Sequence, residues 1–195
     1  MKYRRYLSLL FVPFLFLPEY SCLINRKEDH IVQLDEEYSF KSESTKKIMF
    51  DCYATDIYLE QREDISDIEI KLEGKTSSNL AFDISDNNST IKVNQSVVDK
   101  HTQINQNQSV VKMKVPSNVP YVYDIKMYAG EIHMDSCDTE KFVINLKCGD
   151  VFCNNSSSKE KSKIKVRTGD INITDFKSDK DKLETSVTLG DVTHN

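Results

Sequence analysis

Four short glycine-acid corners recur at nearly constant spacing in the C-terminal part of the chain, and they constrain its fold more than any other feature. The corners are Gly130-Glu131, Gly149-Asp150, Gly169-Asp170 and Gly190-Asp191. Successive corner glycines are separated by 19, 20 and 21 positions. A repeat of about 20 residues is typical of stacked repeat proteins and not of a compact enzyme domain.

Apolar residues alternate on both sides of every corner. The positions five, three and one before each glycine are occupied, in that order, by Ile125, Met127 and Ala129, by Ile144, Leu146 and Cys148, by Ile164, Val166 and Thr168, and by Thr185, Val187 and Leu189. A period of two indicates a strand with one buried face, and here the phase slips by one residue at the corner. Glycine tolerates a positive φ and an acid can accept hydrogen bonds from nearby backbone N–H groups, so the pair predicts a bend that keeps both arms facing one core.

Two all-β architectures share this pattern. In a single-domain β-solenoid each repeat is one coil, and like side chains stack in columns about 4.8 Å apart. In an antiparallel meander or sandwich each glycine-acid pair is instead a two-residue hairpin loop. We favour the solenoid because the pair recurs once per repeat and not at every turn. The expected columns are Ile132, Val151, Ile171 and Val192, and Met127, Leu146, Val166 and Val187.

The same alternation begins earlier in the chain. Ile48, Phe50, Cys52 and Ala54 lead to Thr55-Asp56, where threonine replaces glycine. We therefore expect one β-strand repeat domain over residues 46–195. Further strands are predicted around residues 68–72, 80–84, 91–93 and 111–115, with a hairpin between the second and third, an exposed Gln/Asn-rich loop at 99–109, and no helix.

Residues 1–22 have the pattern of a signal or targeting segment. Lys2, Arg4 and Arg5 precede a mostly apolar run from Tyr6 to Leu17, which is short for a membrane span. Ser21-Cys22 is similar to the end of a lipoprotein signal, which would make Cys22 a lipidation site and a membrane tether. A plain signal, an uncleaved anchor and a mitochondrial presequence are the alternatives. Residues 23–45 are polar and are expected to form a linker.

With these residues laid out, the chain resembles the DUF4097-type family of adhesin-like β-strand-repeat proteins. The matching segments are Lys114-Val115-Pro116, Ile125 to Glu131, Cys148-Gly149-Asp150-Val151, Thr168-Gly169-Asp170-Ile171 and Leu189-Gly190-Asp191-Val192. Phe50-Asp51-Cys52 and the stretch from Ser109 to Cys153 are also similar to the animal members of the family. The resemblance implies a β-solenoid over residues 46–195 and supplies no catalytic residues. Family members generally continue with further repeats, so the resemblance also suggests truncation, a partner, or self-association through an open C-terminal end.

The corner acids Asp56, Glu131, Asp150, Asp170 and Asp191 are expected to stack in a column. Carboxylates are the preferred ligands of Ca²⁺, but the longer glycine-rich calcium repeat is absent. We therefore expect each acid to cap its own turn, with no metal and no cofactor.

Lys126, Lys147, Lys165 and Arg167 fall on the outward phase of the repeats. They form a basic strip on a chain whose formal net charge is −5. Such a strip suits an anionic glycan or a lipid headgroup layer, whereas the overall charge argues against nucleic acid as a partner. The alternative is a solvated sheet face that lysines keep from aggregating.

Four cysteines follow Cys22, namely Cys52, Cys137, Cys148 and Cys153. Their even number allows three disulfide pairings in an oxidising compartment. Cys148 and Cys153 fall on inward positions, where a free cysteine behaves as a small hydrophobic residue. Buried thiols are favoured, and at least one disulfide is the alternative.

These features favour a non-enzymatic adhesin-like interaction module, exported to the cell envelope or secreted, that binds an unknown protein or glycan. No histidine lies in a metal or catalytic-triad motif and no glycine-rich phosphate loop is present. A carbohydrate-active β-helix that uses acids on one face and a purely structural scaffold are the alternatives.

Overall fold

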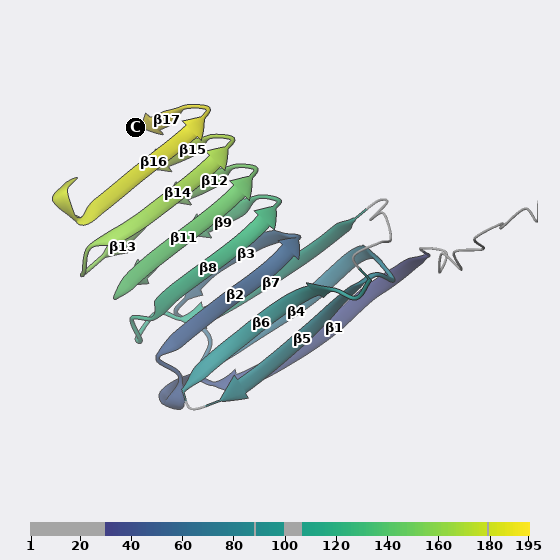
Figure 1. The fold of residues 1–195 in the computed structure, drawn as a ribbon. Helices are drawn as coiled ribbons and strands as arrows, with labels where there is room; N and C mark the ends of the chain where they lie inside the picture. The colour runs from purple at the N-terminus through teal and green to yellow at the C-terminus, as the bar shows by residue number, and fades with distance from the viewer. Residues whose placement is uncertain (1–29, 88, 100–106, 179) are drawn as a thin grey trace, which may run out of the picture.

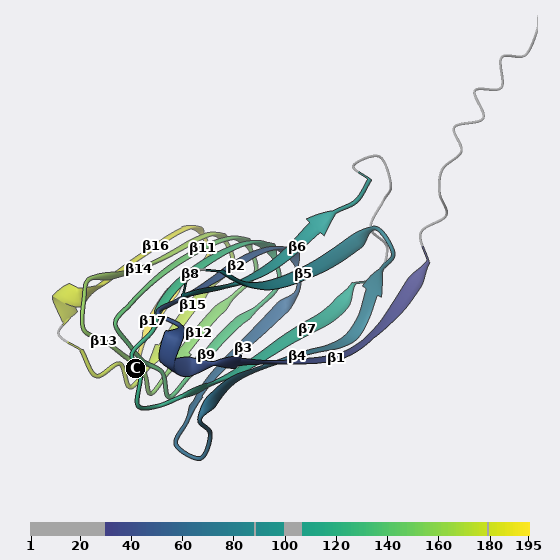
Figure 2. The ribbon, with the colours of Figure 1, turned by 90° about the horizontal axis from the view of Figure 1, so that it is seen from below.

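The computed structural model describes residues 30–87, 89–99, 107–178 and 180–195, which form two facing β-sheets (Figures 1 and 2). The first sheet has the order β1 (Ile31–Lys41), β4 (Asp67–Ser77), β7 (Gln108–Pro116), β3 (Asp56–Arg62), β9 (Ile132–Asp135), β12 (Val151–Asn154), β15 (Ile171–Thr174) and β17 (Val192–His194). The second has the order β16 (Leu183–Leu189), β14 (Ser162–Thr168), β11 (Lys141–Cys148), β8 (Val122–Ala129), β2 (Lys47–Ala54), β6 (Thr90–Val97) and β5 (Leu80–Asn87). We call them sheet A and sheet B.

Three short elements complete this part of the chain. The strands β10 (Asp138–Thr139) and β13 (Ser157–Ser158) pair with each other, and Ser42–Ser44 and Lys180–Lys182 form 3-10 helices. Neither helix has the length or apolar composition needed to cross a membrane, and no other helix occurs among the described residues.

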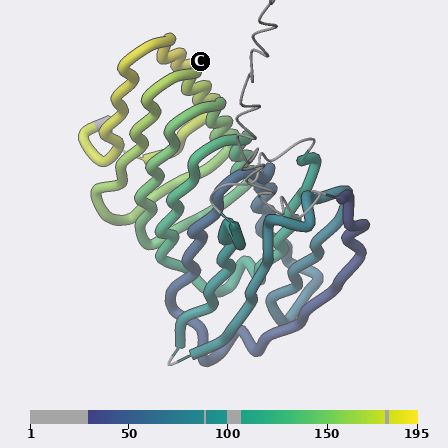
Figure 3. Tube along the Cα trace, turned by 45° about the vertical axis from the view of Figure 1, so that its right-hand side comes forward, coloured from purple at the N-terminus to yellow at the C-terminus, as the bar shows by residue number. Residues whose placement is uncertain are grey.

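The C-terminal strands form successive turns of a stack, in which each turn places one strand in sheet B and the next in sheet A (Figure 3). All neighbouring strands from β8 to β17 within each sheet run parallel. Val151 pairs with Ile132 on one side and with Ile171 on the other, and Leu146 pairs likewise with Met127 and Val166. The predicted β-solenoid is therefore confirmed, and the hairpin alternative is wrong for these repeats.

Each glycine-acid pair is the corner at which the chain leaves sheet B and enters sheet A. Gly149 has φ +128°, and a Cβ atom at this position would lie 1.9 Å from the carbonyl oxygen of Gly130 in the preceding turn. Gly169 and Gly190 make the same close approach, each to the carbonyl of the glycine before it. Glycine is therefore required twice, by the φ angle and by the lack of space between adjacent turns.

The N-terminal part of the stack is mixed in direction. The strands β2 and β3 add one more parallel turn beside β8 and β9, and β6 and β7 add another beyond it. In contrast, β4, β5 and β1 pair antiparallel with their neighbours at this end. The N-terminal end of the stack is thus formed by antiparallel strand pairs, whereas the solenoid repeats pair in parallel.

The predicted linker at residues 23–45 is wrong over most of its length. Residues 31–41 form β1, which pairs with β4 from Ile31–Ser77 to Lys41–Asp67. Leu34 is buried, and Tyr38 and Phe40 pack against the core, while the run of acids between them hides this alternation in the sequence. The signal segment 1–22 and Cys22 lie outside the described residues, as does most of the predicted loop at 99–109.

The core is a continuous file of inward side chains from both sheets. Ile132, Val151 and Ile171 are fully buried, as the columns predict. The position just before each corner glycine is not part of this core, because there the strand already turns toward sheet A. Ala129 is half-buried, Cys148 and Thr168 are exposed, and Leu189 is 65% exposed. In the last turn Val192 and His194 are also exposed, since a neighbouring turn covers them on one side only.

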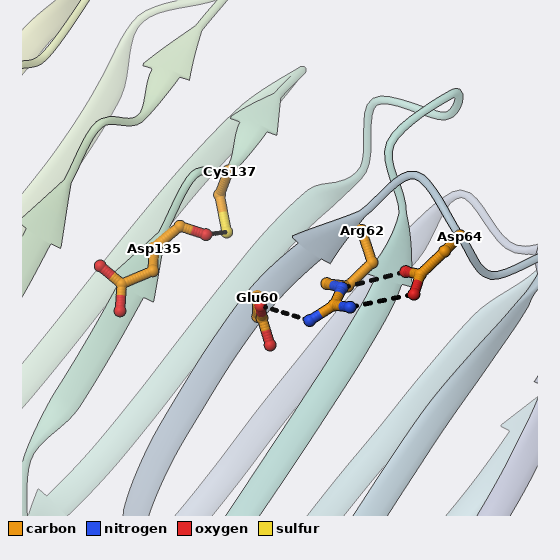
Figure 4. A network of polar contacts seen from close by, with 5 residues as sticks. All are labelled: Glu60, Arg62, Asp64, Asp135 and Cys137. Atoms are coloured by element: carbon orange, nitrogen blue, oxygen red, sulfur yellow. Dashed lines mark hydrogen bonds and ion pairs between the residues drawn. The ribbon is translucent and has the colours of Figure 1, made fainter.

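The four cysteines that the structure describes are free thiols, so no disulfide pairs them. Cys52, Cys137 and Cys153 are buried, whereas Cys148 is exposed, contrary to its inward assignment from sequence. The thiol of Cys137 lies 3.3 Å from the carbonyl oxygen of Asp135 (Figure 4). Burial raises the pKa of Cys52 to about 12 and that of Cys153 to about 11, which keeps both thiols protonated and unreactive near neutral pH.

We expect Gly149→Ala to destabilise the protein strongly. The strained φ costs about 1–3 kcal/mol by itself, and the contact of the new methyl group with the Gly130 carbonyl adds to it. Thermal unfolding followed by circular dichroism should show a melting temperature lowered by several degrees. Thr168→Ala, which also lies next to a corner but is exposed, is the control and should change stability by less than about 0.5 kcal/mol. Equal melting temperatures for the two variants would contradict this account of the corner.

Alkylation should distinguish Cys148 from the other thiols. With iodoacetamide at pH 8, Cys148 should react in the folded protein, while Cys52, Cys137 and Cys153 react only after denaturation, because burial keeps them protonated. Peptide mapping by mass spectrometry separates these sites from Cys22. A pair of cysteines that stays unmodified in denaturant until a reductant is added would show a disulfide instead.

Candidate functional site

The corner acids stack as expected, but their carboxylates serve the neighbouring turn. Asp150 Oδ1 accepts a hydrogen bond from the backbone N–H of Asp170 at 2.7 Å, and Asp170 Oδ1 accepts one from Asp191 at 2.8 Å. Asp56 does the same for the N–H of Glu131 at 2.9 Å. The expectation that each acid caps its own turn is therefore wrong, since the stacked geometry brings the next turn's donor closer. These acids link adjacent turns.

Glu131 departs from this pattern because its side chain is longer. Its Oε2 lies 3.0 Å from His133 Nε2, two residues further along the outer face of sheet A. Among the described residues, no group of three or more His, Cys, Asp or Glu side chains is arranged to hold a metal ion.

The four predicted basic residues lie together on the outer face of sheet B. All four side chains are exposed. The strand register places them in two rows that cross the strands, at positions two and four before each corner. The first row is Tyr53, Tyr128, Lys147, Arg167 and Thr188, and the second is Asp51, Lys126, Asn145, Lys165 and Ser186. We call these ten residues the basic surface.

The basic surface is hollowed, and its ten residues line the hollow together with inward residues at its floor, such as Met127 and Leu146. Asp51 is the only carboxylate among the lining residues. Hydroxyl and amide groups of Asn145, Ser186 and Thr188 complete the polar lining. The site therefore presents four cations and one anion, together with uncharged hydrogen-bonding groups.

Tyrosine rings order one end of the first row. Tyr53 and Tyr128 are stacked with ring centroids 4.9 Å apart and an interplanar angle of 7°. Lys147 Nζ lies 4.9 Å from the centroid of the Tyr128 ring, from the neighbouring strand on the other side. A cation over a tyrosine ring is attracted by the ring's quadrupole, so Tyr128 helps to hold the Lys147 ammonium in place.

Among the described residues, the four cations of the basic surface lack ion pairs, whereas several cations elsewhere on the protein have them. Lys161 and Lys163, on or beside β14, both pair with Glu184, and Lys47 pairs with Asp124. At the end of β3, Arg62 is enclosed by Glu60 and Asp64 (Figure 4). In the part of the chain that the structure describes, no such ion pair neutralises the four cations of the basic surface. Their charges are therefore available to a ligand.

An aromatic ladder on sheet A was not found from the sequence. Tyr58, His133 and Phe152 stack on adjacent strands, with centroid separations of 4.4 Å and 4.6 Å. Each residue lies two positions after a corner acid, so aligning the repeats on their corners would have shown them as one column. His133 is covered by a ring on both faces, and Tyr58 and Phe152 are each covered on one face. We assign the ladder to stabilisation of the stack.

Comparison with known proteins agrees with this architecture. A solved structure of a candidate cell adhesion protein from Clostridium sporogenes aligns with a TM-score of 0.55 and 8% identity, covering 86% of this chain and 99% of that one. At this identity the similarity shows a shared fold alone. Candidate adhesins from Bacteroides fragilis (13% identity, 85% and 97% covered, TM-score 0.26) and Parabacteroides merdae (15%, 83% and 81%, 0.28) align less closely.

No curated protein matches the chain in sequence. The sequence model of the toastrack DUF4097 family, however, matches residues 122–195, which span the turns from β8 to β17. The resemblance seen in the corner motifs is thereby confirmed. Residues 122–195 are therefore similar to the toastrack DUF4097 family, and the four turns from β8 to β17 form the matched region.

Proposed function

We propose that this chain is a non-enzymatic, adhesin-like interaction module, and that the basic surface is its contact face for an anionic partner. The observation that carries this proposal is the pair of positive charges on Lys147 and Arg167, which no ion pair with the described residues neutralises. The two residues face each other on adjacent strands of a protein whose overall charge is negative.

Folding alone does not favour this arrangement. Like charges directly opposite each other on neighbouring strands are destabilising, whereas opposite charges contribute roughly 0.2–1 kcal/mol. The same two strands show the favourable alternative outside the basic surface, where Lys163 of β14 faces Glu184 of β16 and pairs with it. A ligand that brings negative charge to the surface would offset the repulsion between Lys147 and Arg167.

The basic surface gives little support to an enzymatic alternative. Glycoside hydrolysis generally needs two carboxylates across the scissile bond, and Asp51 is the one carboxylate in the hollow. The buried thiols of Cys52 and Cys153 have raised pKa values, which makes them poor nucleophiles. The similar solved structures are described as candidate adhesins, which agrees with an interaction role.

Export to the cell envelope or the exterior is part of the proposal. It rests on the signal-like residues 1–22 and on the adhesion role suggested for the similar solved structures. Cys22 would then serve as a lipid tether, and the β-strand domain would begin by β1.

Arg167→Glu should separate binding from stability. The new carboxylate would face Lys147, so we expect the free energy of unfolding to increase by about 0.2–1 kcal/mol. Retention of the protein on a sulfonate resin at pH 7 and low salt should decrease. The resin is a suitable probe because a protein of net charge −5 is retained only through a local basic surface.

The matched control is Lys177→Glu, which makes the same change in net charge. Lys177 is exposed, lies outside the basic surface and has no ion pair with the described residues. Equal elution of the two variants would refute the assignment of the contact face. A loss of stability in Arg167→Glu would refute the argument from repulsion.

A further inference from the structure

Building on the function proposed above, we propose that the basic surface binds a linear sulfated polysaccharide whose chain crosses the strands along the axis of the stack. The solenoid geometry sets this direction. Equivalent residues of successive turns lie in rows perpendicular to the strands, and each row of the basic surface contains two cations.

The register sets the spacing of these cations. Neighbouring strands lie about 4.8 Å apart, so Lys147 and Arg167 form a close pair, while Lys126 and Lys165 lie about 10 Å apart on either side of Asn145. The rows are separated by two residues along a strand, or about 7 Å. A polymer with sulfate groups at regular intervals can meet both rows at once, and the Arg167 guanidinium can bind a sulfate through two parallel hydrogen bonds.

The tyrosine rings favour a sugar chain over single-stranded nucleic acid. Binding of nucleic acid bases relies on open aromatic faces. Tyr53 covers one face of Tyr128, and the Lys147 ammonium lies over the other. The surface therefore offers ammonium, guanidinium, hydroxyl and amide groups, which match the sulfates and hydroxyls of a sulfated glycan.

The shape and composition of the surface argue against a lipid bilayer as its ligand. Binding to a bilayer gains strength from apolar side chains that enter the headgroup region. Tyr128 is the only exposed large hydrophobic residue among those that line the hollow, and both faces of its ring are already in contact with Tyr53 and Lys147. A hollowed surface also receives a narrow chain more closely than a planar membrane.

The acidic charge of the rest of the protein does not prevent this binding. At physiological ionic strength, interactions between exposed charges are largely screened beyond about 8 Å. A short oligosaccharide on the basic surface therefore responds mainly to the four cations and to Asp51. Neutralising Asp51 should strengthen binding, which is a gain of function that a misfolded variant could not produce.

The experiment is isothermal titration calorimetry of the full chain with a heparin hexasaccharide at low and high salt. We expect binding at low salt that weakens strongly at high salt. Asp51→Asn should tighten binding by about 2- to 5-fold, as expected for one exposed charge interaction. Asn145→Glu, which places an acid between Lys126 and Lys165, should weaken it. Glu63→Gln removes an equally exposed acid outside the basic surface and should leave the affinity unchanged.

Three parallel titrations test the ligand class, using a hyaluronan hexasaccharide, a six-residue oligothymidylate and vesicles of phosphatidylcholine with phosphatidylserine. Weaker binding of all three supports the proposal, and equal or tighter binding of any of them overturns it. If the sulfonate resin retains the protein through Arg167 but the heparin hexasaccharide does not bind, the ligand class is wrong while the contact face stands. If neither binds, the proposed function fails as well.

Discussion

The close contact between backbone atoms at the corners sets the register on which this structure depends. At Gly149 the backbone approaches the Gly130 carbonyl so closely that no side chain fits, and Gly169 approaches Gly149 in the same way. Successive turns are then held in one register, and the carboxylates of Asp150 and Asp170 link them further by accepting hydrogen bonds from backbone N–H groups of the next turn. In a β-sheet a slip of one residue would move every core side chain to the surface. The corners therefore specify the core as well as the bends.

The same register arranges the side chains on the outer faces of both sheets. Once turns are aligned, outward residues at equal distances from the corner form rows across the strands. Sheet A carries the row of stacked rings around His133, and sheet B carries the basic surface with Lys147 and Arg167. A solenoid thus presents regularly spaced groups on a broad face, which suits an extended and repetitive ligand more than a small molecule.

The ring ladder of sheet A and the basic surface of sheet B differ in how far their side chains interact with one another. In the ladder of sheet A the rings stack on one another, so little ring surface remains for a partner to contact. On the basic surface of sheet B, Tyr53 stacks on Tyr128 and Lys147 lies over the Tyr128 ring. The cations of Lys126, Lys165 and Arg167 remain without ion pairs among the described residues. The unbalanced charge is what distinguishes the basic surface from an ordinary solvated sheet face, where Lys163 and Glu184 neutralise each other.

The sequence by itself determined the repeat, the parallel columns and the outward position of the four cations, because period-two alternation and the corner glycines are local signals. It could not show that Asp150 bonds to the following turn or that Tyr128 is covered on both faces, since these contacts join residues about 20 to 75 positions apart. Nor could it show that Cys148 lies outside the core, because the alternation does not reveal that the strand already turns toward sheet A there. It also missed β1, because the pairing with β4 gives that strand its order while acids between Leu34 and Tyr38 interrupt the apolar pattern. Local backbone preference thus fixed where the chain bends and which side chains face inward. Only the tertiary stack decided which neighbours those residues meet, because contacts between turns come from alignment in space and leave no local pattern in the chain.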